Sequence, residues 1–172
     1  MKTADVIIVG SGASGLFNAL FLPQDYKVIV ITKKEVEESD SFLAQGGISA
    51  LKNPEDYDSY FEDTMKAGHY ENDKGAVEKM IKESPQIIQD LKDFGVRFDL
   101  KDGEIEFTRE GGHSTFRILH HEDLTGKEIT SHLYEEAKKR DNITIMENCT
   151  MIDIIEKDGE CKGIVYLSLI HI

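Results

Sequence analysis

The chain has 172 residues, of which 40% are hydrophobic and 31% charged. This length supports one ordinary domain with a hydrophobic core, and the composition excludes a disordered tail. Acidic residues outnumber basic ones by 33 to 20 and the formal charge is −13, so we expect no nucleic-acid partner. The apolar runs are too short to cross a bilayer and no signal peptide is evident, so we expect a cytoplasmic protein without a membrane partner.

The N-terminal segment predicts a strand-helix-strand unit. The apolar run Val6–Val9 precedes a glycine-rich turn at residues 10–15, and an apolar segment at residues 16–22 follows and ends at Pro23. A second apolar run, Val28–Ile31, comes at the spacing of a short crossover. Strands this uniformly apolar are usually covered on both faces, as parallel strands are. The pattern therefore indicates an α/β fold.

The middle of the chain predicts helices. Asn53, followed by proline and two acidic residues, is typical of a helix N-terminus, and this helix should extend to about residue 68. Asp73 begins a second helix with one apolar stripe. Ser84 and Pro85 interrupt that stripe, which predicts either a kink or two helices in series.

The last third predicts one helix followed by strands. Thr125 and Glu128 match a capping box, which predicts a helix reaching about residue 140. Residues 143–147 read as a strand, and residues 151–167 read as a hairpin around the Asp-Gly pair at residues 158–159.

Two segments and two cysteines remain. Residues 32–51 have the composition of a loop, and residues 167–172 form an apolar tail with no turn or cap, so we expect the chain to be cut off there. Cys149 and Cys161 are too few for a disulfide framework or a metal site. We expect both cysteines to serve as small apolar residues.

The glycine-rich turn indicates dinucleotide binding. In Gly10-Ser11-Gly12-Ala13-Ser14-Gly15 the first glycine permits the tight turn, the second permits close approach to a pyrophosphate, and the third permits close packing of helix on strand. The acidic residue that usually follows the second strand is missing, because Lys33 and Lys34 lie there. Read alone, these lysines could contact an NADP phosphate, reach the dinucleotide differently or be solvated.

Two further segments have ligand-binding composition. Residues 40–48 form a polar loop with paired glycines, and residues 108–114 place Arg109, Glu110 and His113 around two more glycines. Each segment could equally be a flexible turn. His120 and His121 are adjacent, so on any regular element they would point in different directions. No Cys, Asp or Glu spacing completes a metal site, and we interpret them as structural or surface histidines.

Together these motifs resemble the L-aspartate oxidases, a family within the fumarate reductase and succinate dehydrogenase flavoprotein superfamily. The resemblance implies a Rossmann-like FAD-binding domain of the GR2 type, incomplete, with a helical insertion and a C-terminal β-hairpin. Residues 1–172 would form the N-terminal part of that domain, and the capping and C-terminal helical domains would be absent. The catalytic arginine and the carboxylate-binding residues would follow residue 172, so no catalytic residue is assigned and we expect the piece alone to be inactive. The segments that carry the resemblance are residues 6–16, 44–48, 108–114, 117–120 and 123–126.

The resemblance also implies roles for particular residues. In the membrane-bound relatives a histidine bonds covalently to the flavin, and Asp40 occupies the matching position here, which implies non-covalent FAD. Glu110 would face the amino group of the substrate, and a carboxylate opposite an ammonium discriminates aspartate from succinate. The implied FAD contacts are Gly10, Ser11, Gly12, Ala13, Ser14, Gly15, Lys33, Asp40, Ser41, Phe42, Leu43, Ala44, Gln45, Gly46 and Gly47.

The implied reaction is the oxidation of L-aspartate to iminoaspartate, with oxygen or fumarate as electron acceptor. In this family it is the first step of NAD biosynthesis through quinolinate, and a quinolinate synthase is a possible partner. Two alternatives stay open: a soluble flavoprotein of the fumarate reductase or succinate dehydrogenase type, and a non-catalytic dinucleotide-binding module.

Overall fold

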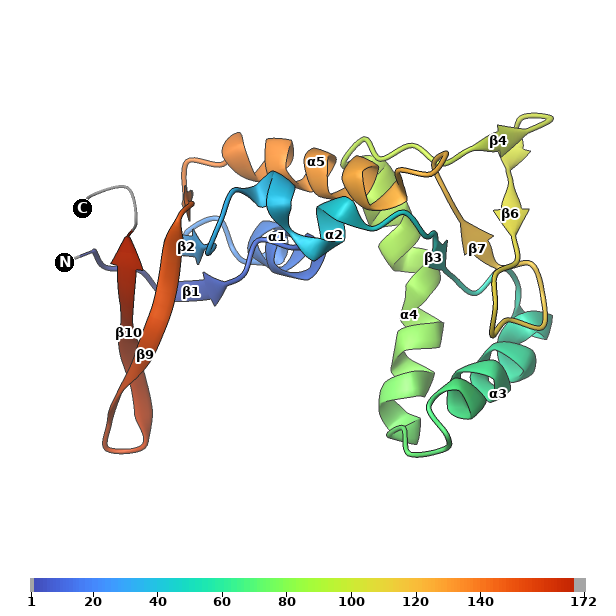
Figure 1. Cartoon of the computed structure of the whole chain (residues 1–172), viewed down its shortest axis with the longest axis horizontal. Helices are drawn as coiled ribbons and strands as arrows, with labels where there is room; N and C mark the ends of the chain where they lie inside the picture. The colour runs from blue at the N-terminus through green and yellow to red at the C-terminus, as the bar shows by residue number, and fades with distance from the viewer. Residues whose placement is uncertain (1, 169–172) are drawn as a thin grey trace. The chain divides into compact units, whose positions relative to one another are not determined.

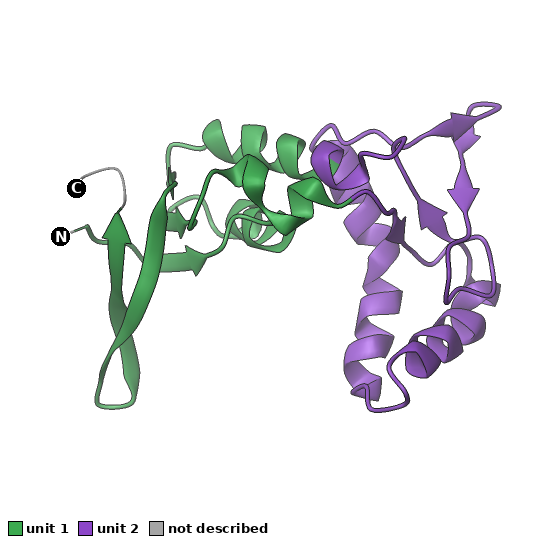
Figure 2. Cartoon of the chain, in the orientation of Figure 1, with its two compact units in different colours: residues 1–44, 129–172 green, residues 45–128 purple. Residues whose placement is uncertain are grey.

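The computed structural model describes residues 2–168 (Figure 1). The chain divides into two compact units, where its length alone suggested one domain. Unit 1 comprises residues 1–44 and 129–172, and unit 2 comprises residues 45–128 (Figure 2). Among the described residues, no helix has the length and apolar character needed to cross a bilayer.

Unit 1 contains a three-stranded parallel sheet in the order β1-β2-β8. Its strands are β1 (Val6–Val9), β2 (Val28–Ile31) and β8 (Ile143–Met146), and the helix α1 (Ala13–Phe21) connects β1 to β2 (Figure 1). The predicted strand-helix-strand unit is therefore confirmed. All four residues of β2 are buried, as expected for the central strand. The expectation of two covered faces is wrong for β1, an edge strand on which Ile7 and Val9 are 37% and 52% exposed.

The predicted hairpin is also confirmed. The strands β9 (Cys149–Lys157) and β10 (Glu160–Ser168) pair antiparallel. Asp158 and Gly159 have φ of 57° and 78°, the positive values that a two-residue hairpin turn requires. Cys149 is buried with Ile29 and Ile31, whereas Cys161 is exposed, so the prediction of a small apolar role is wrong for Cys161. The part of the predicted apolar tail at residues 169–172 lies outside the described residues.

The segment interpreted as a loop, residues 32–51, contains short elements. They are η1 (Val36–Glu38), α2 (Asp40–Leu43) and β3 (Ile48–Ser49). Side chains define them locally: Ser39 Oγ caps α2 by accepting from Phe42 N at 3.3 Å, and Glu147 Oε1 accepts from Val36 N at 2.9 Å. Elements of two to four residues are too short to show a hydrophobic period, so they could not be predicted from the pattern of residues 32–51.

Unit 2 packs two helices beside small antiparallel sheets. Asn53 Oδ1 and Asp73 Oδ1 accept from the amides of Asp56 and Ala76, so both predicted helix starts are confirmed. The core contains Tyr60, Met65, Val77 and Ile81. The elements of unit 2 are η2 (Pro54–Asp56), α3 (Tyr57–Ala67), α4 (Lys74–Asp93), β4 (Leu100–Lys101), β5 (Glu104–Ile105), β6 (Phe107–Thr108) and β7 (Ile118–Leu119), with sheets β3-β7-β6 and β4-β5.

The prediction of two helices in series at Ser84 and Pro85 is wrong, because α4 runs through both residues. Pro85 has no amide to donate to the carbonyl of Ile81, four residues earlier. Ser84 Oγ donates to that carbonyl instead, at 2.7 Å, and also accepts from Leu51 N at 2.8 Å. The serine thus supplies the hydrogen bond that the proline removes, and the helix continues.

The predicted capping box at Thr125 and Glu128 is wrong. The helix α5 (Thr125–Lys138) already includes Thr125, since Glu128 N donates to Leu124 O at 2.9 Å. Thr125 Oγ1 accepts from His121 N at 3.1 Å, and Glu128 Oε1 accepts from Arg97 N at 3.0 Å. Both side chains thus accept hydrogen bonds from amides of segments that precede the helix.

Candidate functional site

The three glycines in the glycine-rich turn of unit 1 are constrained for different reasons. Gly10 has φ of 115°, a conformation that L residues rarely adopt. A Cβ on Gly15 would lie 2.1 Å from the carbonyl oxygen of Gly10, and a Cβ on Gly12 would lie 2.8 Å from Ser41 Oγ. The third glycine therefore allows α1 to pack against the end of β1, as the sequence predicted.

The N-terminus of α1 is open to an anion. Its N-cap, Gly12, has no side chain to cap the first amides, and no acidic residue lies in the first turn. Helix N-termini of this kind attract phosphate groups through free amides and the helix dipole. Ser11 is only 2% exposed and its Oγ has no hydrogen-bond partner. A buried hydroxyl without a partner is costly, and a pyrophosphate oxygen would satisfy it, so these residues fit the diphosphate of FAD.

A cleft of about 550 Å³ extends from this turn within unit 1. Lys34 at its rim is paired with Glu38 at 2.8 Å, while Lys33 is an exposed lysine beside it. Sequence reasoning missed the wall formed by Cys149, Thr150 and Met151 at the start of β9, because nothing in that segment marks a ligand site. Of the predicted FAD contacts, those lining the cleft are Gly10, Ser11, Gly12, Lys33, Asp40 and Ser41.

The remaining FAD contacts predicted in unit 1 do not line this cleft. Ala13, Ser14 and Gly15 form the first turn of α1 and carry the first amides of that helix, but the residues that line the cleft do not include them. Residues 42–44 follow Ser41 at the end of α2, and Leu43 is 64% exposed. Their predicted contacts with FAD stay predictions.

Unit 2 carries the second glycine pair and Glu110. Gly47 N donates to Glu110 Oε1 at 3.3 Å, and a Cβ on Gly46 would lie 3.6 Å from Glu110 Oε2. A Cβ on Gly47 would lie 2.4 Å from both Ile118 Cγ2 and Leu119 O. Two segments predicted separately from the sequence are thus adjacent in space. A cavity of about 360 Å³ adjoins them, lined by Gln45, Gly47, Asp99, Thr108, Glu110, His120, Glu122 and Asp123.

His120 and His121 share one partner, Asp99, which the sequence did not single out. Their Nδ1 atoms lie 3.1 and 3.4 Å from Asp99 Oδ2 and Oδ1. The two histidines follow β7 outside any helix or strand, so the divergence expected on a regular element does not apply to them, and Glu122 N also donates to Asp99 Oδ2. Among residues 2–168, no group of three or more His, Cys, Asp or Glu side chains is arranged to hold a metal ion.

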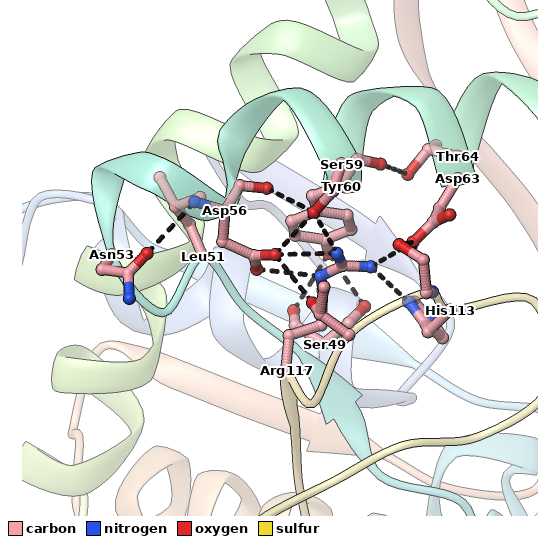
Figure 3. A network of polar contacts seen from close by, with 12 residues as sticks. Ser49, Leu51, Asn53, Asp56, Ser59, Tyr60, Asp63, Thr64, His113 and Arg117 are labelled. Carbon is pink, nitrogen blue, oxygen red and sulfur yellow. Dashed lines mark hydrogen bonds and ion pairs between the residues drawn. The ribbon is translucent and has the colours of Figure 1, made fainter.

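A buried arginine, Arg117, forms the densest polar network of unit 2 (Figure 3). Arg117 is fully buried, and its Nε and Nη2 donate to the two carboxylate oxygens of Asp56 at 2.9 and 2.8 Å. Its Nη1 donates to Asp63 Oδ2 at 2.6 Å and lies 3.1 Å from His113 Nδ1. The guanidinium also lies 4.8 Å from the centre of the Tyr60 ring. The segment that contains Arg117 is thereby fixed to α3.

The network changes the ionisation of its members. Hydrogen bonding from Arg117 lowers the pKa of Asp56 from its ordinary value of 3.8 to about 2. Burial raises the pKa of Asp63, but hydrogen bonds from Arg117 and Ser114 outweigh it and the net pKa is lowered. Hydrogen bonding to Asp56 raises the pKa of Arg117. All three groups are therefore charged at neutral pH, as a buried ion pair needs to be.

A family profile described as FAD binding domain matches residues 5–169. The chain belongs to the FAD binding domain family. It is 42% identical over 165 residues to an L-aspartate oxidase from Clostridium perfringens and 46% identical over 160 residues to one from Clostridium acetobutylicum. These matches cover 96% and 92% of this chain but 38% and 37% of those relatives, so the chain spans less than half of their length.

Solved structures give the same fold. A quinol fumarate reductase from E. coli superposes with a TM-score of 0.89 at 25% identity, covering 95% of this chain and 29% of that chain. Sdh1 from Mycobacterium smegmatis superposes with a TM-score of 0.86 at 27% identity, covering 97% and 31%. The α/β FAD-binding fold and the homology to L-aspartate oxidases are both confirmed.

Proposed function

We propose that this chain supplies the N-terminal part of the FAD-binding domain of an enzyme that oxidises L-aspartate to iminoaspartate. The capping and C-terminal helical domains, with the catalytic arginine and the groups that bind the substrate carboxylates, belong to sequence outside residues 1–172. The observation that carries the proposal is Glu110, whose carboxylate lies at an acidic cavity and accepts from Gly47 N. The identity of 42–46% to L-aspartate oxidases supports the same substrate.

FAD, held non-covalently, would supply the redox chemistry of the reaction. The amides at the start of α1 and the hydroxyl of Ser11 hold its diphosphate in the cleft of unit 1. Lys33 adds a positive charge at the rim of that cleft. Asp40, also at the rim, offers no nucleophilic nitrogen for a covalent flavin link. The chain therefore orients the cofactor through backbone amides and short polar side chains.

Glu110 binds the ammonium group of the substrate in this proposal. The hydrogen bond from Gly47 leaves further lone pairs on the carboxylate to accept from an ammonium. Asp99, Glu122 and Asp123 line the same cavity and add negative charge there, which favours a cationic group and disfavours a plain diacid. Holding the nitrogen fixes the direction of the Cα hydrogen, and alignment of this kind lowers the barrier by several kcal/mol.

The proposed electron acceptors are oxygen and fumarate, and a quinolinate synthase is the proposed partner that consumes the unstable imine. In its cellular role the reaction would be the first step of NAD biosynthesis through quinolinate.

A second candidate is a soluble fumarate reductase or succinate dehydrogenase-type flavoprotein, which the superposition on a fumarate reductase at TM-score 0.89 favours. That enzyme class handles dicarboxylates without an ammonium group, so a carboxylate such as Glu110 would have no partner on the substrate. The fumarate reductase-type flavoprotein is the weaker candidate, because the chain is 42% identical to an L-aspartate oxidase and 25% identical to the fumarate reductase.

Glu110→Gln in the full-length, FAD-loaded protein tests the proposal. We expect the KM for aspartate to rise about 10-fold to 30-fold, which corresponds to the binding free energy of one charge-assisted hydrogen bond. The inhibition constant of succinate, which has no ammonium, should change by less than about 2-fold. Steady-state kinetics measure both quantities, and Glu104→Gln, an exposed change on β5, is the matched control.

Two results would contradict the proposal. An unchanged preference for aspartate over succinate in Glu110→Gln would favour the fumarate reductase candidate. A full-length protein that binds FAD but turns over neither aspartate nor succinate would favour a non-catalytic dinucleotide-binding module.

A further inference from the structure

The loop that carries Glu110 makes its ion-pair and charged hydrogen-bond contacts near its C-terminal end. Residues 109–117 connect the paired strands β6 and β7. Glu110 is exposed and is followed by Gly111 and Gly112, the latter with φ of 87°. Two successive glycines have more conformational freedom to lose than any other pair of residues. The position of Glu110 therefore needs contacts beyond the pairing of β6 with β7.

The contacts made by Glu110 itself are weak. Its side chain accepts one hydrogen bond, from Gly47 N at 3.3 Å, and its carbonyl accepts one from His113 N, also at 3.3 Å. Exposed hydrogen bonds of this length contribute little net stability. Ordering the two glycines costs about 1–2 kcal/mol per residue, so these two bonds alone do not fix the carboxylate.

The C-terminal end of the loop is fastened to α3 by charged groups. Asp63 Oδ2 accepts from Ser114 N at 2.7 Å and from Ser114 Oγ at 2.8 Å. The same oxygen accepts from Arg117 Nη1 at 2.6 Å, and Thr115 Oγ1 donates to Asp56 at 2.7 Å. Asp63 is thus the carboxylate of α3 that contacts the loop backbone nearest to Glu110.

We propose that Asp63 is a positioning residue for Glu110, holding the loop through Ser114 and Arg117 so that the Glu110 carboxylate is preset for an ammonium group. This inference rests on the proposed function and names what sets its specificity. Asp56 has a different part, because both of its carboxylate oxygens hold Arg117 and its contact with the loop is at Thr115. Without Asp63, the loop keeps its attachments to Asp56 at Thr115 and Arg117 but loses the one at Ser114.

The test is Asp63→Asn in the full-length, FAD-loaded protein, since the amide keeps the shape of the side chain and removes its charge. We expect the KM for aspartate to rise about 5-fold to 10-fold with kcat lowered less than about 2-fold, because one charge-assisted contact is weakened. The succinate inhibition constant and the flavin absorbance spectrum should not change. Asp58→Asn, an exposed change on the same helix with the same loss of charge, is the control.

A double-mutant cycle separates positioning from a general structural effect. If Asp63 acts through Glu110, Asp63→Asn should change the aspartate KM by less than about 2-fold in the Glu110→Gln background. Equal losses in both backgrounds, or equal effects on aspartate and succinate, would overturn the inference. Should Asp63→Asn fail to fold, Ser114→Ala removes only the Oγ contact, and a rise of about 2-fold in the aspartate KM is expected.

The outcomes also separate this inference from the proposed function. Normal aspartate selectivity in Asp63→Asn together with its loss in Glu110→Gln overturns only the role of Asp63. Normal selectivity in Glu110→Gln overturns both.

Discussion

In unit 1 the groups proposed to hold the ligand are the backbone amides at the start of α1 together with a few polar side chains, and the glycines of the turn matter because they carry no side chain. In unit 2 the loop that carries Glu110 is held by side chains, with one buried guanidinium between two carboxylates. A backbone site depends on its glycines, most of all on Gly15, where an added Cβ would lie 2.1 Å from Gly10 O. A side-chain site depends on each charged partner, because removing one leaves another charge buried and unpaired.

Arg117→Met should have the largest effect, on unit 2 alone. The change leaves the carboxylates of Asp56 and Asp63 without their counter-charge, which costs about 3–5 kcal/mol. Hydrogen exchange of α3 in the full-length protein measures this loss as a local free energy of unfolding. Arg109→Met, at an exposed position of the same loop, should cost less than about 0.5 kcal/mol. Equal protection in both variants would show that the buried pair does not hold the loop.

Gly15→Ala should have the next largest effect, on unit 1 alone. The new Cβ would lie 2.1 Å from Gly10 O, which is backbone, so α1 has to move away from β1. We expect FAD affinity to fall about 100-fold, or about 3 kcal/mol. Flavin fluorescence titration of the full-length protein measures it. Gly111→Ala adds a Cβ with no neighbour within 4 Å and should leave FAD affinity unchanged; equal losses in the two variants would argue against the close-packing role.

The sequence predicted the cleft of unit 1 because its determinants are local. The turn at residues 10–15 lies between one strand and one helix, so pattern and spacing identify it without any distant contact. The wall at residues 149–151 was missed because it reaches the cleft through contacts between residues more than a hundred positions apart: β8 pairs with β2, and Cys149 N donates to Thr32 O at 2.9 Å. The sequence thus predicted the local ligand-binding turn but not the order of the strands in the sheet.

The polar network of Arg117 in unit 2 could not be predicted in the same way. Arg117 contacts Asp56 and Asp63 across 61 and 54 residues of sequence, and no local pattern relates such positions. The resemblance drew attention to the segment containing Arg117 but gave it no role. The strands β6 and β7 have two residues each, too few to show alternation. The composition of residues 108–114 suited a ligand-binding loop or a flexible turn equally, and it was the resemblance to the L-aspartate oxidases that singled out Glu110.

Acid should weaken the polar network of Arg117 before it affects the glycine-rich turn. The pKa of Asp56 is lowered in the folded protein, so its contribution to stability is complete above the ordinary pKa of 3.8 and is lost as the pH falls towards about 2. We expect a loss of about 2 kcal/mol across this window. Hydrogen exchange of α3 between pH 5 and pH 2.5, corrected for intrinsic rates, measures it. Asp56→Asn should be less stable at pH 5 and should lose this acid dependence; an unaltered profile would contradict the assignment.

Ser84→Ala should have the smallest effect, and it tests whether side chains also maintain the helices of unit 2. The variant removes the hydroxyl that donates to Ile81 O and accepts from Leu51 N, so we expect a loss of about 1 kcal/mol. In a Pro85→Ala background, the restored amide of residue 85 can donate to Ile81 O, and Ser84→Ala should then cost about half as much. Urea denaturation of the four proteins measures the cycle. An equal cost in both backgrounds would mean that Ser84 acts only through Leu51, and that α4 continues past the proline without its help.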